Sequence, residues 1–179
     1  MRPRLYIGAI CVCFAAACGF EASLGPADGV RSVRIEEDMP NPALVDEGLV
    51  VLTEDIEILS ASDSAHYRNK FGDDKIGALR GVTLELVEIR IEGLDLARSS
   101  PPQIFLWDQR MDAVVGAEIE LDDPEVDAIR AAMLGETQLL APLALSLDAP
   151  LDALDATRPE LHIVLVVQPT LRIDVASAL

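Results

Sequence analysis

The sequence predicts a mostly β protein, an antiparallel β-sandwich of immunoglobulin-like or jelly-roll-like topology with one or two short helices. From Val30 onward, apolar residues alternate with polar ones at period two, the pattern of strands that bury one face. About seven such runs occur, separated by turn-forming residues. Because no cysteine follows Cys18, this domain has no disulfide and depends on an aliphatic core.

The clearest strand covers Val82–Glu92. Apolar residues occupy its even positions as far as Leu86 and its odd positions from Val87 onward, so the alternation slips by one residue between them. A β-bulge absorbs such a slip without exposing either apolar set. The sequence therefore predicts a bulge there, or a bend at which the strand passes from one sheet to the other.

A second long strand is predicted over Leu161–Val175, where the odd positions are apolar except at Pro169. Proline has no N–H to donate to a neighbouring strand, so at Pro169 this strand is expected to lie at an edge, to bulge or to break. The same period-two pattern predicts shorter strands over Val33–Glu36, Val50–Leu59, Gln103–Trp107, Val115–Leu121 and Leu143–Leu147.

The clearest helix is predicted over Asp123–Gly135. Asp123 is expected to cap it, Pro124 suits its first helical position, and Gly135 suits its end. Its apolar residues Val126, Ile129 and Met133 share one face. A shorter helix is predicted over Asp63–Lys70, before a turn at Gly72-Asp73-Asp74, and a single helical turn over Pro150–Leu154.

The amino terminus has the three parts of a secretory signal. Met1-Arg2-Pro3-Arg4 is basic, Leu5–Phe14 is almost wholly apolar, and Ala15-Ala16-Ala17 precedes Cys18. The apolar stretch is too short for a membrane-spanning helix, which needs about 20 residues. This segment resembles that of a bacterial lipoprotein precursor, although Ala15 stands where leucine is usual. The resemblance covers roughly the first twenty residues and implies cleavage before Cys18 and acylation of its thiol and new amino group.

Two alternatives to lipidation remain open, ordinary secretion and an uncleaved anchor. Ordinary signal peptidase accepts Ala-x-Ala and would cut the same bond. It would leave Cys18 as an unpaired thiol, whereas acylation consumes that thiol. The lipoprotein interpretation divides the chain into a signal peptide (1–17), a lipidated Cys18 on a flexible tether (18–29) and the sandwich domain (30–179). Gly19, in place of the aspartate that retains lipoproteins at the inner membrane, implies the outer membrane by family analogy.

Charge excludes some partners. The chain carries 31 Asp and Glu against 14 Lys and Arg, a formal charge of −17, which repels the phosphates of nucleic acids. Only 4% of its residues are aromatic, too few for a carbohydrate or base-stacking platform. The partners we expect are the membrane, through the lipid anchor, and another envelope protein.

No residue pattern predicts a catalytic, cofactor or metal site. His66 and His162 are the only histidines, and no Gly-x-Ser-x-Gly motif or phosphate-binding glycine loop is present. Both histidines are read as ordinary hydrogen-bonded or surface residues. The acidic clusters are read as solvated charge and helix caps, although they are possible calcium ligands: Glu36-Glu37-Asp38, Asp73-Asp74, Glu118–Asp127, and the trio Asp148, Asp152 and Asp155.

The function expected from the sequence is that of a non-catalytic, lipid-anchored binding or assembly module of the cell envelope. The alternative is a calcium-dependent or hydrolytic envelope module that uses the acidic loops. The two differ in one structural respect, because only the alternative requires carboxylates from distant segments to meet in one concave pocket.

Overall fold

The computed structural model describes residues 21–40, 49–93, 95, 97, 100–148 and 160–174. Within them the chain forms two helices, α1 (Ala61–Gly77) and α2 (Asp123–Gly135), and a short 3-10 turn, η1 (Pro26–Asp28). The strands are β1 (Glu21–Leu24), β2 (Val33–Pro40), β3 (Leu49–Leu59), β4 (Leu79–Glu92), β5 (Gln103–Leu106), β6 (Gln109–Asp112), β7 (Glu118–Glu120), β8 (Leu139–Asp148) and β9 (Glu160–Asp174).

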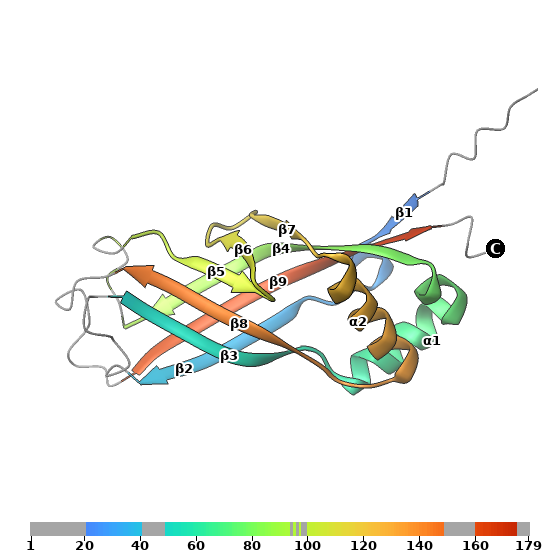
Figure 1. Cartoon of the computed structure of the whole chain (residues 1–179), viewed down its shortest axis with the longest axis horizontal. Coiled ribbons are helices and arrows are strands. Elements are labelled where there is room, and N and C mark those ends of the chain that lie inside the picture. The colour runs from blue at the N-terminus through green and yellow to red at the C-terminus, as the bar shows by residue number, and fades with distance from the viewer. Residues whose placement is uncertain are drawn as a thin grey trace, which may run out of the picture.

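The strands make two antiparallel sheets (Figure 1). The first has the order β1-β9-β4-β7, with β2 pairing with β9 on the same side as β1, and the second has the order β3-β8-β5-β6. Leucine and isoleucine side chains of both sheets form one core, in which Leu84, Leu145 and Leu165 are among the completely buried residues. This arrangement confirms the prediction of a mostly β sandwich.

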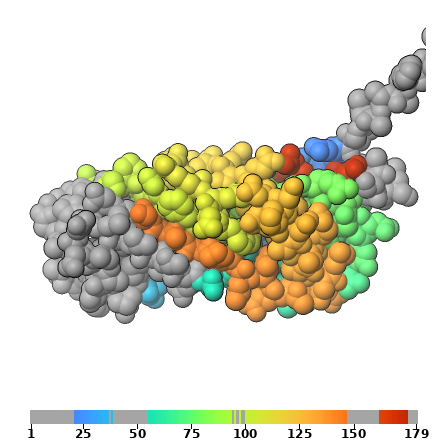
Figure 2. Space-filling model, viewed as in Figure 1, coloured from blue at the N-terminus to red at the C-terminus, as the bar shows by residue number. Residues whose placement is uncertain are grey.

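The two helices lie together at one end of the sandwich (Figure 1). α1 carries the chain from β3 in the second sheet to β4 in the first, and α2 carries it back from β7 to β8. The space-filling view shows α2 and the adjoining end of β8 packed together beside β5 (Figure 2). The helices therefore extend the core beyond the point where the two sheets separate.

Both irregularities predicted for the long strands are present. The register of β4 against β9 shifts between Leu86 and Glu88, which places the extra residue of a bulge at Val87. On the side of β9 away from β4, β2 pairs as far as Val167 and β1 begins at Leu171. Pro169 lies in the gap between these two partners, so β9 is locally an edge there.

Two strands lie where the sequence predicts none. β1 lies within the predicted tether, and its residues pair with the C-terminal part of β9, so 21–24 form a strand instead of a flexible linker. β6 follows β5 through a two-residue turn, in which Trp107 and Asp108 both have positive φ (50° and 67°). Such hairpin turns usually contain asparagine and glycine, so Trp-Asp gives no turn signal in the sequence.

Most predicted strands differ from the observed ones only in length. β2 and β8 extend further than predicted, whereas β7 is only Glu118–Glu120, because the chain turns at Gly116 with φ +89° before it begins. The helical turn predicted over Pro150–Leu154 lies outside the described residues, as do the signal segment and Cys18.

α2 has the predicted bounds, but the predicted details of its ends are wrong. Its N-cap is Asp122 rather than Asp123, without a side-chain cap bond, and the left-handed residue at its C-terminus is Glu136 (φ 52°) rather than Gly135. α1 is longer than predicted, and the predicted turn is only a break at Gly72 (φ 80°, ψ 159°), after which the helix resumes as far as Gly77.

Candidate functional site

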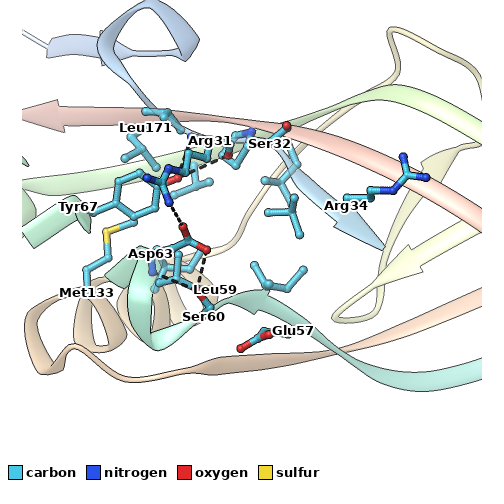
Figure 3. Close-up of a pocket in the computed structure, with 17 residues that line it drawn as sticks. Arg31, Ser32, Arg34, Glu57, Leu59, Ser60, Asp63, Tyr67, Met133 and Leu171 are labelled. Carbon is cyan, nitrogen blue, oxygen red and sulfur yellow. Dashed lines mark hydrogen bonds and ion pairs between the residues drawn. The ribbon is translucent and has the colours of Figure 1, made fainter. Parts of the chain in front are cut away.

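A pocket of about 190 Å³ opens where the start of β2 and the end of β3 diverge (Figure 3). One lip is formed by residues 31–34 and the other by residues 57–60. Its walls are mainly apolar side chains from β2, β3, β4, β9, α2 and the segment before β2: Val30, Val33, Ile58, Leu59, Val82, Leu84, Ile129, Met133, Pro169 and Leu171. The site is therefore an apolar recess between the two sheets, next to the helices.

The start of α1 determines the shape of one wall. The hydroxyl of Ser60 accepts a hydrogen bond from the backbone N–H of Asp63 (3.0 Å), the usual N-cap arrangement. Asp63 and Tyr67 are four residues apart, so both lie on the same face of the helix. That face is turned toward the segment before β2, which supplies Arg31.

Charged and polar groups at the mouth are bonded to one another. Nη1 of Arg31 lies 2.7 Å from Oδ1 of Asp63, and the other carboxylate oxygen accepts a 2.7 Å hydrogen bond from the Ser60 hydroxyl. This network ties the segment before β2 to the end of β3 and the start of α1 (Figure 3). In the same view Arg34 and Glu57 point away from the recess.

Tyr67 forms the boundary between this polar mouth and the apolar interior. Its side chain is buried, and its hydroxyl accepts a hydrogen bond from the backbone N–H of Arg31 (2.9 Å). The ring stacks on Phe71, with the centroids 6.0 Å apart. Burial raises the pKa of Tyr67, so the hydroxyl remains protonated at neutral pH.

Asp63 is kept ionised by its neighbours. Partial burial raises the pKa of its carboxyl group, but the hydrogen bonds from Ser60 and Arg31 and the positive charge of Arg31 outweigh that effect. The net result is a pKa below the ordinary value of 3.8. The mouth of the pocket thus carries an ion pair, while its interior offers apolar surface.

The two histidines are both hydrogen-bonded, and the structure does not bring them together. His66, on α1, has Nδ1 3.5 Å from Nη2 of Arg31 at the edge of the mouth. His162, on β9, has Nδ1 2.7 Å from Asp38 and Nε2 3.3 Å from Glu36, both on β2. Each histidine therefore has polar partners on a neighbouring element of the fold.

Several acidic residues of the predicted clusters form ion pairs with nearby basic side chains. Asp73 pairs with Arg68 (2.8 Å), Asp127 with Arg130 (2.6 Å), and Glu120 with Arg172. Among the described residues, no three His, Cys, Asp or Glu side chains are grouped closely enough to hold a metal ion. Of the predicted trio, Asp148 ends β8, and Asp152 and Asp155 lie outside the described residues.

Sequence analysis did not identify Arg31, Ser60, Asp63 or Tyr67 as a group. One signal was present, since Ser60-x-x-Asp63 is a capping pattern that marks the start of α1. Nothing local connects Arg31 to Tyr67, which is 36 positions away. The pocket is assembled from segments that meet only in the folded chain.

Neither helix of the described part of the chain is both long and apolar enough to span a bilayer. Comparison with known proteins gives no family assignment. The chain matches no protein-family model, no curated protein and no solved structure.

Proposed function

We propose that this chain is a non-catalytic, lipid-anchored binding or assembly module of the bacterial cell envelope, and that the pocket between β2 and β3 is its binding site. The observation that carries the proposal is the apolar recess of about 190 Å³ at a place where two sheets diverge. Binding sites are typically concave, mostly apolar and bordered by a few positioned polar groups. The pocket has each of these properties.

The size of the recess limits what enters it. A cavity of about 150 Å³ lined by aliphatic side chains is large enough to hold benzene. A pocket of about 190 Å³ therefore suits one ring or one branched aliphatic group rather than a whole cofactor. Such a group is the size of a single apolar side chain of a partner protein.

The proposed location follows from the amino terminus. The basic start, apolar stretch and Ala15-Ala16-Ala17-Cys18 resemble a lipoprotein signal, and we propose that Cys18 carries the lipid that holds the domain at the outer membrane. Incorporation of radiolabelled palmitate into the wild type, and its loss in Cys18→Ser, is the expected result. Label that persists in Cys18→Ser contradicts acylation at this residue.

Binding at the pocket is tested with benzene as a probe and with methionine methyl groups as reporters. Met133 lines the pocket, whereas Met111 is equally buried but lies elsewhere in the core. We expect the NMR signal of the Met133 methyl group to shift saturably with benzene, while that of Met111 does not. Val30→Phe, which places a larger side chain in the pocket wall, abolishes the shift. A Met133 signal that does not respond contradicts the proposed site.

A further inference from the structure

Both lips of the pocket are edges of strands. β2 pairs only with β9 and β3 only with β8 in the described part of the chain. Among the described residues β2 and β3 do not pair with each other, and the recess opens between the start of β2 and the end of β3 (Figure 3). An unpaired edge presents a row of backbone N–H and C=O groups, which is a template for an added strand.

The edge of β3 has one irregularity, a shift of its register against β8 between Glu57 and Leu59, and it carries the acidic residues Glu54, Asp55 and Glu57. β3 runs from Leu49 to Leu59 and contains no lysine and no proline. The only proline of β2 is Pro40, at the end of that strand furthest from the pocket. The edge of β3 is therefore regular up to Glu57, and this part offers its backbone groups to an extended segment that reaches the recess.

The group that enters the recess is expected to be uncharged. Arg31, Asp63 and Ser60 already satisfy one another at the mouth, and the Tyr67 hydroxyl is bonded to a backbone N–H. A charged head group would have to displace these partners, whereas an aliphatic side chain would gain from burial against the walls.

Acidic side chains on the β3 side of the opening favour basic residues next to that apolar group. Asp55 and Glu57 are exposed on β3. On the other side, Arg31 and Arg34 are paired with Asp63 and Glu36, and Glu36 and Asp38 also contact His162. The whole chain carries a formal charge of −17. Opposite charge steers association and suppresses partners of like charge.

We propose that the opening binds an extended, basic peptide segment of a partner protein, which pairs with the free edge of β3 and places one aliphatic side chain in the pocket. This inference rests on the proposed function and names the class of ligand. Backbone hydrogen bonds would supply affinity independent of sequence, and the pocket would select the residue that anchors the segment.

The probe is a short synthetic peptide that alternates lysine with valine and has leucine at its centre. Its binding to the protein is followed by NMR of the backbone amides. We expect saturable shifts at residues 31–34 and 57–60, and weaker binding at higher salt. A peptide N-methylated along one edge cannot donate to β3 and is expected to bind about tenfold more weakly.

Two further comparisons separate pairing from simple charge attraction. The same peptide with glutamate in place of lysine is expected not to bind, because it has the same sign of charge as the protein. Val30→Phe in the pocket is expected to weaken binding, whereas Val115→Phe, at an exposed site outside the pocket, is not. Binding that is indifferent to N-methylation and to Val30→Phe overturns the inference, because it reports attraction of lysine alone.

The benzene and peptide probes together distinguish failure of the peptide inference from failure of the proposed function. If benzene shifts Met133 but the lysine peptide does not bind at residues 31–34 and 57–60, the peptide inference is wrong and the pocket remains a binding site. If neither probe binds, both proposals are wrong.

Discussion

The two helices lie against each other at the same end of the sandwich but are stabilised in different ways. α2 is uninterrupted and buries an apolar face, Val126, Ile129, Ala132 and Met133. α1 is broken at Gly72, and its buried residues are Ser64, Tyr67 and Ile76. Two of these three make hydrogen bonds to other segments, Ser64 to the Thr137 carbonyl (2.6 Å) and Tyr67 to Arg31.

The difference shows where the stability of each helix comes from. α2 is positioned by burial of its apolar face against the core, as amphipathic helices usually are. α1 is positioned largely by directed polar contacts at its first two turns, and those turns form the wall of the pocket. The candidate site therefore depends on the helix with the weaker apolar anchor.

The largest expected effect compares the two kinds of anchor. Met133→Ala on α2 removes most of a completely buried side chain, so the free energy of unfolding should fall by roughly 2–5 kcal/mol. Tyr67→Phe on α1 keeps the ring and loses the hydrogen bond with Arg31, which should cost about 1 kcal/mol. Urea denaturation of both variants measures the difference. Equal losses would contradict the idea that the helices are anchored differently.

One glycine from each helix, Gly72 in α1 and Gly135 in α2, gives a pair of predictions of opposite sign. Gly72 has φ 80° and ψ 159°, a conformation that is essentially restricted to glycine, so Gly72→Ala should destabilise by about 1–3 kcal/mol. Gly135 lies within α2 at a negative φ, and an added Cβ would meet only Thr137 at 3.5 Å. Gly135→Ala should therefore stabilise by about 0.5–1 kcal/mol. Thermal unfolding of the two variants tests both predictions. A Gly72→Ala variant that is more stable than the wild type would contradict the conclusion that the break in α1 requires glycine at this position.

Sequence patterns predicted those parts of the fold that local chemistry determines. The period-two runs of β4 and β9, the bulge at Val87 and the bounds of α2 all follow from residues close together in the chain. β1 was missed because its strand conformation depends on pairing with the distant end of β9. β6 was missed because Trp107 and Asp108 form its turn without the usual residues.

The candidate site was less predictable than the fold for a related reason. Its lining residues come from the segment before β2 and from β2, β3, β4, β9, α1 and α2. Apolar alternation indicates which residues are buried, but it does not indicate where two buried surfaces fail to meet. The pairing of Arg31 with Asp63 spans 32 positions and follows no motif. Only the capping pattern at Ser60 was visible in advance.

The N-caps of the two helices supply the next smaller prediction. Ser60 accepts a hydrogen bond from the N–H of Asp63, so Ser60→Ala should lower the free energy of unfolding by about 1 kcal/mol. Asp122 makes no side-chain cap bond, so Asp122→Ala should cost no more than about 0.3–1 kcal/mol through the helix dipole. Chemical denaturation at low salt measures both variants. A larger loss for Asp122→Ala than for Ser60→Ala would contradict the observed capping.

The smallest expected effect concerns pH and the ion pair at the mouth of the pocket. The pKa of Asp63 is lowered in the folded protein, so the unfolded state binds its proton more readily than the native state does. The contribution of Asp63 to stability is therefore fully present above its ordinary pKa of 3.8 and is lost as pH falls through the lower folded value.

Asp63→Asn should lower the free energy of unfolding at neutral pH. In acid, the difference in free energy of unfolding between this variant and the wild type should become smaller. Arg31→Gln should show the same convergence, because it removes the charge that helps to lower this pKa. Denaturation curves from neutral to acidic pH test the argument, and a difference between wild type and Asp63→Asn that stays constant with pH would refute it. Since Arg31 is more than half exposed, we expect each variant to lose only about 0.2–1 kcal/mol at neutral pH.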